Sequence, residues 1–219
     1  VPRVLVLTPT RELAAQIEDN IKTYAKNVKV RTALIFGGVS QHKQVAQIRK
    51  GADVLVATPG RLLDLCNQGL LSLEWTEFLV LDEADTMLDM GFIHDIRRVI
   101  AMLPEKRQSL FFSATMPDSI VKLSKTILTD PIRVEVARVS SAAETVDQRM
   151  LFVSQGAKRD LLVDILNRPE VDTALVFTRT KYGADKVVRY LKKNNIRGEA
   201  IHGNKSQPQR EKAMNAFRK

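Results

Sequence analysis

The residues of this chain best suited to chemistry are Asp82, Glu83 and Asp85, which directly follow the apolar stretch FLVL at positions 78–81. An Asp at the end of a buried strand can hold Mg²⁺ through coordinated water, because this ion keeps most of its hydration shell. A Glu beside it can orient and deprotonate a water that attacks a phosphate. In the plainer alternative, the carboxylates only complement the dipole of a following helix, worth about 0.3–1 kcal/mol each. The apolar strand favours the first interpretation, because capping does not require it.

Two short stretches, TPTREL at 8–13 and TPGRL at 58–62, share one construction. In each, a proline sets a turn, a threonine can cap the following helix and an arginine stands in its first turn. A cation at a helix N-terminus is unfavourable unless an anion lies in front of it, and a phosphodiester would meet that need. A plain cap with a solvated arginine is the alternative at either stretch alone. Their repetition, with the pair Gly37 and Gly38 between them, favours a polyanion-binding surface.

Short apolar runs alternate with amphipathic stretches along the chain, a pattern that predicts a parallel sheet covered by helices on both faces. The expected strands are 4–8, 31–36, 53–58, 78–83, 109–114 and 132–136 in the first part and 150–154, 173–178 and 198–203 in the second. The polar motifs follow these strands, and ligands of open parallel sheets gather at the carboxyl ends. We therefore expect two α/β units, at 1–136 and 149–219, joined by a polar linker at 137–148.

Two other polar clusters carry a weaker signal. The triplet SAT ends a strand, and Ser113 and Thr115 could simply cap a helix that starts near Pro117. In the second part we expect a helix from about Gln207, on which Gln207 and Arg210 are spaced to face one ligand. A polar surface helix explains that spacing equally well.

The net charge of +9 and the pI of about 9.8 favour a polyanionic partner, with nucleic acid ahead of membrane lipid. Residues 1–136 contain 17 basic and 16 acidic side chains, whereas residues 137–219 contain 17 and 9. A solvated basic surface is the alternative. In either case the excess of positive charge belongs almost wholly to the second part.

The remaining composition narrows the class of protein. The lone cysteine, Cys66, excludes an internal disulfide, and its apolar neighbours indicate packing rather than reactivity. His42, His94 and His202 are too scattered to indicate a zinc site. No apolar run approaches the roughly 18 residues of a membrane-spanning helix and no signal peptide is visible, so we expect a cytoplasmic protein. The chain starts at a strand and stops inside a helical pattern, and both ends look cut.

Seven motifs, PTREL, GG, TPGRL, DEAD, SAT, LVFTRT and HG…QPQR, stand in the order and at the separations typical of the DEAD-box ATP-dependent RNA helicases, which the chain resembles over nearly its whole length. The stretch GGVS…ADVLVATPGRLLDL looks most like the bacterial RhlE-type branch. The resemblance implies an α/β fold of two RecA-like parallel-sheet units in tandem. Both units look truncated, the first without its phosphate-loop strand and the second without its C-terminal part.

The resemblance also implies roles for individual residues. Asp82 would hold the Mg²⁺ of bound ATP through water and Glu83 would activate the hydrolytic water. Asp85 would link to Ser113 and Thr115 and couple the nucleotide state to closure of the two units. An RNA backbone track, read without sequence preference, would comprise Pro9, Thr10, Arg11, Gly37, Gly38, Thr58, Pro59, Gly60, Arg61, Arg179, His202, Gly203, Gln207 and Arg210. Bending of the clamped strand would separate a short duplex.

The chain departs from this family in what it lacks. The aromatic-plus-glutamine segment and the GxxxxGK[ST] loop that precede PTREL are absent, and so are the later arginines that reach the γ-phosphate. We therefore expect negligible ATP hydrolysis by these 219 residues alone, and a first sheet with a gap beside the SAT strand and exposed edges. Two other functions remain open: a non-catalytic RNA-binding or scaffold module, which would not need adjacent Asp82 and Glu83, and a DNA-directed translocase.

Overall fold

The computed structural model describes residues 1–135 and 146–218, and the chain divides into two compact units, Val1–Val134 and Glu135–Lys219. The first unit ends close to the expected position 136. Most of the predicted linker, 137–148, lies outside the described residues.

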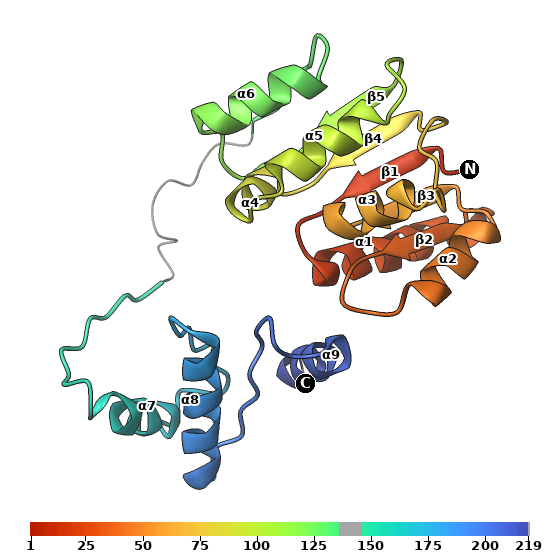
Figure 1. Ribbon diagram of the computed structural model, residues 1–219. Coiled ribbons are helices and arrows are strands. Elements are labelled where there is room, and N and C mark those ends of the chain that lie inside the picture. Colours follow the sequence, from red (N-terminus) through yellow and green to blue (C-terminus); the bar gives the residue numbers. More distant parts are fainter. Residues whose placement is uncertain (136–145, 219) are drawn as a thin grey trace. The chain divides into compact units, whose positions relative to one another are not determined.

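The first unit is a parallel five-stranded sheet with the order β2-β3-β1-β4-β5 (Figure 1). Its strands are β1 (Val4–Leu7), β2 (Thr32–Ile35), β3 (Val54–Ala57), β4 (Phe78–Leu81) and β5 (Gln108–Phe111). Its helices are α1 (Arg11–Tyr24), the 3₁₀ turn η1 (Ala25–Asn27), α2 (Gln41–Arg49), α3 (Pro59–Asn67), α4 (Ala84–Asp89), α5 (Ile93–Ala101) and α6 (Asp118–Ile127). The predicted α/β class and five of the six strands expected in this part are confirmed. The sixth is wrong: residues 131–135 form no strand, and the Ile132 side chain is exposed.

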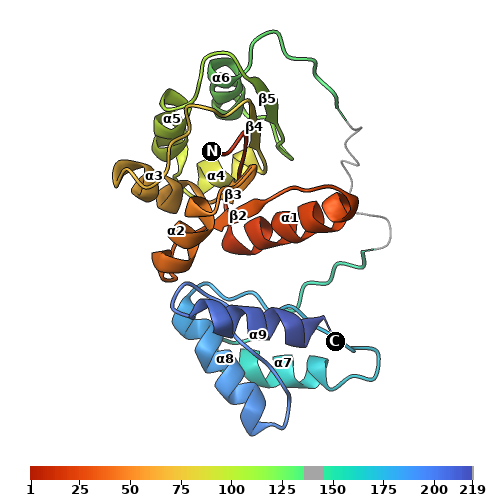
Figure 2. The ribbon, with the colours of Figure 1, turned by 90° about the vertical axis from the view of Figure 1, so that its right-hand side faces the viewer.

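Helices cover the two faces of this sheet unequally. Alternate side chains of a strand point to opposite faces, and both sets are apolar in β1, β3 and β4. One face packs against α1 through Val6, Val56 and Ala14, whereas the other packs against α2 to α6. Figure 2 shows α1 on one side of the strands, with α3 and α5 on the other.

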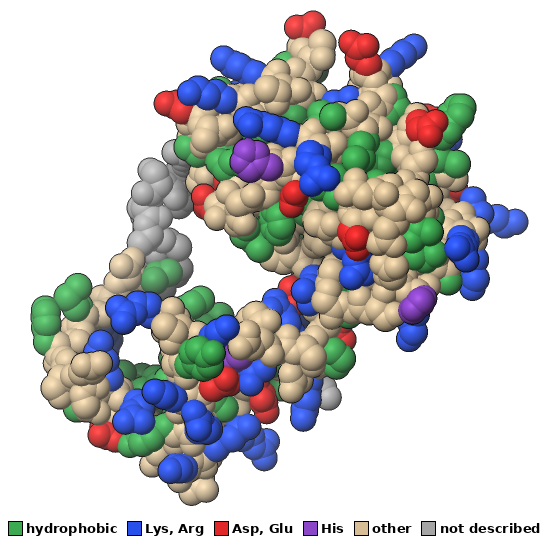
Figure 3. All heavy atoms as spheres, in the orientation of Figure 1, with side chains coloured by type: hydrophobic (Ala, Val, Ile, Leu, Met, Phe, Trp, Pro, Cys, Tyr) green, Lys and Arg blue, Asp and Glu red, His purple; other side chains and the backbone are tan. Residues whose placement is uncertain are grey.

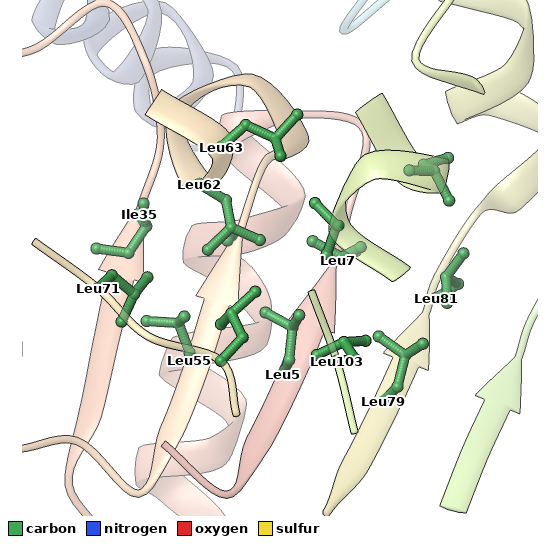
Figure 4. Close-up of a cluster of buried hydrophobic side chains, with 14 of the residues drawn as sticks. Leu5, Leu7, Ile35, Leu55, Leu62, Leu63, Leu71, Leu79, Leu81 and Leu103 are labelled. Atoms are coloured by element: carbon green, nitrogen blue, oxygen red, sulfur yellow. The ribbon is translucent and has the colours of Figure 1, made fainter. Parts of the chain in front are cut away.

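The larger core lies on the face that α2 to α6 cover (Figure 4). Leu5, Leu55 and Leu79 stand side by side on three adjacent strands, and all three are fully buried. Full burial of one such side chain contributes about 1.5–3 kcal/mol. Cys66 packs against this cluster, and burial raises the pKa of its thiol to about 11, as expected of a packing cysteine.

The sheet has no gap among the described strands, so that prediction is wrong. β4 pairs directly with β1 and β5, and β5 forms one edge. The expected exposed edge is present, because β5 contains no fully buried residue and Phe112, directly after it, is half exposed. The chain closes the five strands into one ladder, and the outer side of β5 is left unpaired within the described residues.

The second unit differs from its prediction. It contains α7 (Lys158–Leu166), α8 (Lys181–Lys193) and α9 (Gln207–Phe217), and its described residues form no strand. The three apolar segments expected as strands, 150–154, 173–178 and 198–203, lack ladder partners, and Leu175 and Phe177 are 68% and 92% exposed. A strand exists only by pairing with a neighbour, and an apolar sequence does not supply that neighbour.

Packing in the second unit is between helices. The Arg159 guanidinium of α7 lies 4.9 Å from the ring centroid of Tyr190 in α8, and the Tyr190 hydroxyl donates a hydrogen bond to Asp160. The predicted start of a helix at Gln207 is confirmed, with Ser206 and Gln209 forming a capping box. None of the described helices, in either unit, is long and apolar enough to cross a bilayer.

Candidate nucleotide and nucleic-acid site

The motif-bearing turns of the first unit leave the sheet at one level. The pairing is in register, with Leu7 beside both Leu81 and Ala57. The backbone N–H of Thr8 donates to Ala57 O at 3.0 Å, and that of Asp82 donates to Leu7 O at 3.0 Å. The turns that start at Thr8, Thr58 and Asp82 therefore lie side by side at the carboxyl ends of their strands, as predicted. We call this end of the sheet the motif rim.

Glu83 has an unusual backbone. Its φ and ψ of 50° and 53° lie in the left-handed region, and it directly precedes α4 without a side-chain cap. Its N–H donates to Asp82 Oδ1 at 3.0 Å. A non-glycine residue in this region costs on the order of 1–3 kcal/mol, and such strain clusters at functional sites. The turn exposes the Glu83 side chain beside the half-buried Asp82.

Asp85 joins the β4 turn to the β5 turn. Its Oδ2 accepts hydrogen bonds from the N–H and the hydroxyl of Thr115, at 2.9 and 2.7 Å. Its own N–H donates to Ser113 Oγ at 3.2 Å, and the Ser113 hydroxyl donates to Thr115 O. The link expected from the resemblance is therefore present. The alternative, in which Ser113 and Thr115 cap the next helix, is wrong, because α6 has no side-chain cap.

Two opposing effects act on the pKa of Asp85. Burial acts to raise it, but hydrogen bonds from the Thr115 hydroxyl and N–H, and from the Thr86 N–H, act to lower it. The net effect is a pKa below the usual value of an Asp, so this carboxyl is ionised at neutral pH. An ionised acceptor makes the bonds between the two turns charge-assisted and hence stronger.

Arg11 and Gly38 bring the PTREL and GG motifs together. Gly38 has a φ of +76°, and a Cβ added there would lie 2.3 Å from both terminal nitrogens of the Arg11 guanidinium. The missing side chain at Gly38 therefore leaves the space that Arg11 occupies. The Thr10 hydroxyl caps α1 by accepting from Leu13 N at 3.2 Å, as predicted. A Cβ added at Gly37 would meet no atom within 4 Å, so this position is open to close approach.

The TPGRL turn is built differently from its sequence prediction. Thr58 stands before α3, but its side chain makes no cap hydrogen bond, and it is nearly buried. The Arg61 guanidinium does not stand free for an anion: it donates to Val39 O at 3.2 and 3.3 Å and lies 3.4 Å from Asp64. Arg61 thus ties α3 to the segment after Gly38, and Gly60 is the exposed part of this turn.

A turn of the second unit repeats the hydrogen bonds of the PTREL turn. Thr8 donates its hydroxyl proton to Thr10 O at 3.1 Å, and Thr178 donates to Thr180 O at 3.0 Å. The Thr180 hydroxyl then accepts from Gly183 N at 3.0 Å, as that of Thr10 does from Leu13. Arg179 lies in the middle of this second turn with an exposed side chain.

The HG…QPQR segment gathers a group of polar residues on α8 and the residues before α9. His202 Nε2 lies 3.2 Å from Asp185 Oδ2, and Lys205 Nζ lies 2.8 Å from Asp185 Oδ1. Hydrogen bonds from Lys205 and then His202 hold the pKa of Asp185 below its usual value. Gln207 is only 5% exposed and its Oε1 has no hydrogen-bond partner among the described residues. Arg210 is half-buried one turn later in α9, whereas Gly203 is exposed.

Sequence reasoning missed some of these partners. Asp185 belongs to no motif that we recognised, although it contacts the predicted residue His202, and Lys205, its second partner, lies between the named residues of HG…QPQR. The acceptor for Arg61 is a main-chain oxygen, that of Val39, which no sequence signal identifies. The left-handed conformation of Glu83 had no signal either, because glycine is the residue usually found there.

The carboxylate oxygens of Asp82 fit a magnesium ion that is bound largely through water. The second carboxylate oxygen of Asp82 has no hydrogen-bond donor among the described residues. Carboxylate oxygen is a hard ligand that suits Mg²⁺, and this ion takes few protein ligands when phosphates supply the others. In the part of the chain that is described, no cluster of three or more potential metal ligands occurs, so those residues form no cage for an isolated ion.

Comparison with known proteins identifies the family. The family model described as DEAD/DEAH box helicase matches residues 1–123, more than half of the chain. The chain belongs to the DEAD/DEAH-box helicase family. A second model, described as helicase conserved C-terminal domain, matches residues 157–219. The two matched regions of this helicase-family chain correspond to its two units.

Two relatives define how much of a family member is present. The chain is 40% identical over 230 residues to a rice protein (Oryza sativa subsp. japonica) named DEAD-box ATP-dependent RNA helicase 52A, covering 99% of this chain and 38% of the relative. A solved structure of a DEAD box protein from the hyperthermophile Methanococcus jannaschii is similar with 34% identity and a TM-score of 0.59, covering 99% of this chain and 58% of that one. This DEAD-box chain therefore spans less than two thirds of each relative, 38% of the rice protein and 58% of the solved structure.

Proposed function

We propose that the protein is an ATP-dependent RNA helicase of the DEAD-box type, which binds the RNA backbone without sequence preference and separates short duplexes when its two units close on nucleotide. The family supports this function, and the rice relative is named as an RNA helicase. Because this chain spans part of its relatives, the activity is proposed for the intact protein.

One observation carries the proposal. The strained Asp82–Glu83 turn follows β4, and Arg11, which contacts Gly38, follows β1. These two strands are direct neighbours, so both features lie on the motif rim. An acidic pair suited to metal and water activation is thus next to a cation whose place at a helix N-terminus favours a bound anion. A protein that only bound RNA would gain nothing from the strained Glu83 turn.

Each residue of the rim has its own task in this reaction. Mg²⁺, when bound with ATP, would neutralise charge that develops on the phosphates. Asp82 would hold that ion through water, and the exposed carboxylate of Glu83 would accept the proton of the attacking water. Asp85 transmits the position of this turn to Ser113 and Thr115 through the bonds described above. The predicted track then holds RNA phosphates along the motif rim and the Thr178–Thr180 turn.

A Glu83→Gln variant of the full-length protein tests catalysis. The amide cannot accept the proton, so RNA-stimulated phosphate release should fall by about 10²-fold or more, while ATP-dependent RNA binding remains. Asp89→Asn is the matched control, because Asp89 is an exposed acid on α4 with no partner among the described residues. Unchanged turnover in Glu83→Gln would contradict the role given to Glu83, whereas RNA binding without phosphate release by the wild-type full-length protein would favour the alternative, a non-catalytic RNA-binding or scaffold module.

Four finer assignments belong to this proposal. The 219 residues alone should release no phosphate from ATP above background, since they contain no GxxxxGK[ST] loop; a radiolabelled-phosphate assay with RNA checks this. Competition between RNA and DNA of equal length would reveal a DNA-directed translocase. The stretch GGVS…ADVLVATPGRLLDL supports the RhlE-type branch, and cytoplasmic location is likewise a proposal from sequence.

A further inference from the structure

The outer face of α8 carries a row of cations that none of the motifs explains. Lys186, Arg189 and Lys193 are spaced three and four residues apart, so they project from one side of the helix. Tyr182 stands one turn before Lys186 on the same side, and all four side chains are exposed. We call these four residues the α8 stripe. Figure 3 shows Lys and Arg side chains gathered over the part of the second unit where α8 lies.

The rest of α8 is already engaged. Its inner side, Ala184, Val187, Val188 and Leu191, is at least partly buried. On one flank Tyr190 packs on α7, and on the other Asp185 contacts Lys205. The stripe faces solvent between these two flanks.

Among the described residues, the cations of the stripe form no ion pair. Lys186 and Lys193 have no hydrogen-bond or ion-pair partner among the described residues, and Arg189 donates only its Nε, to the carbonyl of its own helix at Asp185. By contrast, Lys181 bonds to Asn204 and Lys192 lies 3.6 Å from Glu199. The only acid of α8, Asp185, is already paired. Three neighbouring charges without internal compensation repel each other unless a polyanion binds them.

The dimensions and chemistry of the stripe fit RNA. Seven residues separate Lys186 from Lys193, about 10 Å along the helix, which spans about three nucleotides at 3.4 Å each. The exposed ring of Tyr182 offers a surface on which a base can stack, and Lys181 Nζ lies 5.3 Å from its centroid. An acidic peptide would use the cations but has no group that needs the ring.

We propose that the α8 stripe is an auxiliary RNA-binding surface, which starts beside the Thr178–Thr180 turn and extends the backbone track along the outside of the second unit. It rests on the proposed RNA partner but involves none of the motif residues. The contacts are to phosphates and to a stacked base, so they add affinity without sequence preference. The stripe also gives a use to the positive charge concentrated in residues 137–219.

The test is the binding of a fluorescent uridine dodecamer to the 219-residue chain, followed by anisotropy between about 50 and 200 mM salt. In Lys186→Gln/Arg189→Gln/Lys193→Gln, we expect binding weaker by roughly tenfold or more, and a slope of log K against log salt reduced by about 2, at about 0.7 per lost phosphate contact. Glutamine keeps the helix propensity, so α8 should persist by circular dichroism.

Two control variants make the result specific. Lys26→Gln/Lys29→Gln/Lys50→Gln removes the same charge from exposed positions of the first unit and should change the slope far less. Lys186→Arg/Arg189→Lys/Lys193→Arg keeps the charges and should retain binding. Equal losses in the stripe variant and the Lys26/Lys29/Lys50 variant, or no loss in the stripe variant, overturn the proposal.

A variant of the predicted RNA track separates this inference from the proposed function. If Arg11→Gln/Arg179→Gln weakens RNA binding and the stripe variant does not, the stripe proposal fails while the RNA-binding track stands. If only the stripe variant weakens binding, the stripe stands and the predicted track fails. Binding of an oligoglutamate peptide, but not of RNA, through the stripe would assign the surface to an acidic protein and overturn the proposal.

Discussion

The two threonine turns, one in each unit, have the same hydrogen bonds in different surroundings. Thr8–Thr10 and Thr178–Thr180 both form a hydroxyl-to-carbonyl bond and a helix cap. Thr8, however, is fully buried at the end of a strand paired on both sides, whereas Thr178 is exposed after a segment that forms no ladder. The turn is therefore specified by its own few residues, whereas the strand before it is specified by its neighbours.

The difference between the units also appears in how an aspartate is anchored. Asp85 is held by uncharged donors, chiefly the hydroxyl and N–H of Thr115. Asp185 is held by Lys205 and His202. Salt screens attraction between exposed charges but changes hydrogen bonds to neutral donors much less. The first anchor should therefore be robust to salt and the second sensitive to it.

The largest contrast is expected for one leucine in each unit. Leu79→Ala removes a fully buried side chain and should lower the free energy of unfolding by about 3 kcal/mol, within the usual range of 2–5. Leu175→Ala, at a 68% exposed position, should change it by about 0.5 kcal/mol or less. Urea unfolding, monitored by hydrogen exchange in each unit, measures the change in the free energy of unfolding for both variants. An equal cost at Leu175 would mean that the segment is packed in solution, and the contrast would fail.

A smaller contrast is expected for the two aspartates. Asp85→Asn should destabilise the first unit by about 1–2 kcal/mol at neutral pH, because a charge-assisted acceptor of the Thr115 bonds is lost. The folded-state pKa of Asp85 is lowered, so the advantage of the wild type is present above about pH 4 and disappears as pH falls through the lower folded value. Urea unfolding from neutral to acid pH checks the sign.

Asp185→Asn provides the matched measurement in the second unit. Its effect should decrease in high salt, whereas that of Asp85→Asn should persist. A salt-dependent loss in Asp85→Asn, or a salt-independent one in Asp185→Asn, would contradict the distinction between the two anchors.

The smallest contrast is at the helix caps. Thr10→Val removes the cap of α1 and should cost about 1 kcal/mol. Thr180→Val removes the same bond from α8, but here we expect mainly faster hydrogen exchange in the first turn, since no ladder couples this turn to a sheet. Replacement of each threonine by serine keeps the hydroxyl and should restore both. Loss of global stability in Thr180→Val would show that the second turn is coupled as strongly as the first.

Sequence reasoning succeeded where local rules decide the structure. The residues of β1, β3 and β4 are apolar on both faces, which indicates a parallel sheet covered by helices. Because parallel strands end on the same side of a sheet, this also predicted that the motif-bearing turns lie together. The cap at Thr10 and the helix start at Gln207 were likewise local. These features depend on residues within one turn of helix or one strand.

It failed where a distant partner competed with a local one. The cap considered for Thr115 does not form, and its hydroxyl donates to Asp85, 30 residues earlier, a partner indicated by the family resemblance and not by a local rule. Arg61 turns to Val39 O, 22 residues earlier, instead of standing free. The strands of the second unit failed for the related reason that an apolar run says nothing about which chain lies beside it.

Because the strands are paired in register, the length of each strand determines where its turn lies on the motif rim. One residue inserted within Phe78–Leu81 would raise the acidic turn by about 3.3 Å and reverse which face of the sheet each following side chain points to. Asp82 would then lose its level beside Leu7, and α4 would start from the wrong side. Lengthening α1 or α2 at its C-terminal end would not move the turns of the motif rim. New loops grafted onto this fold should therefore be inserted at the C-terminal ends of the helices and not within the strands.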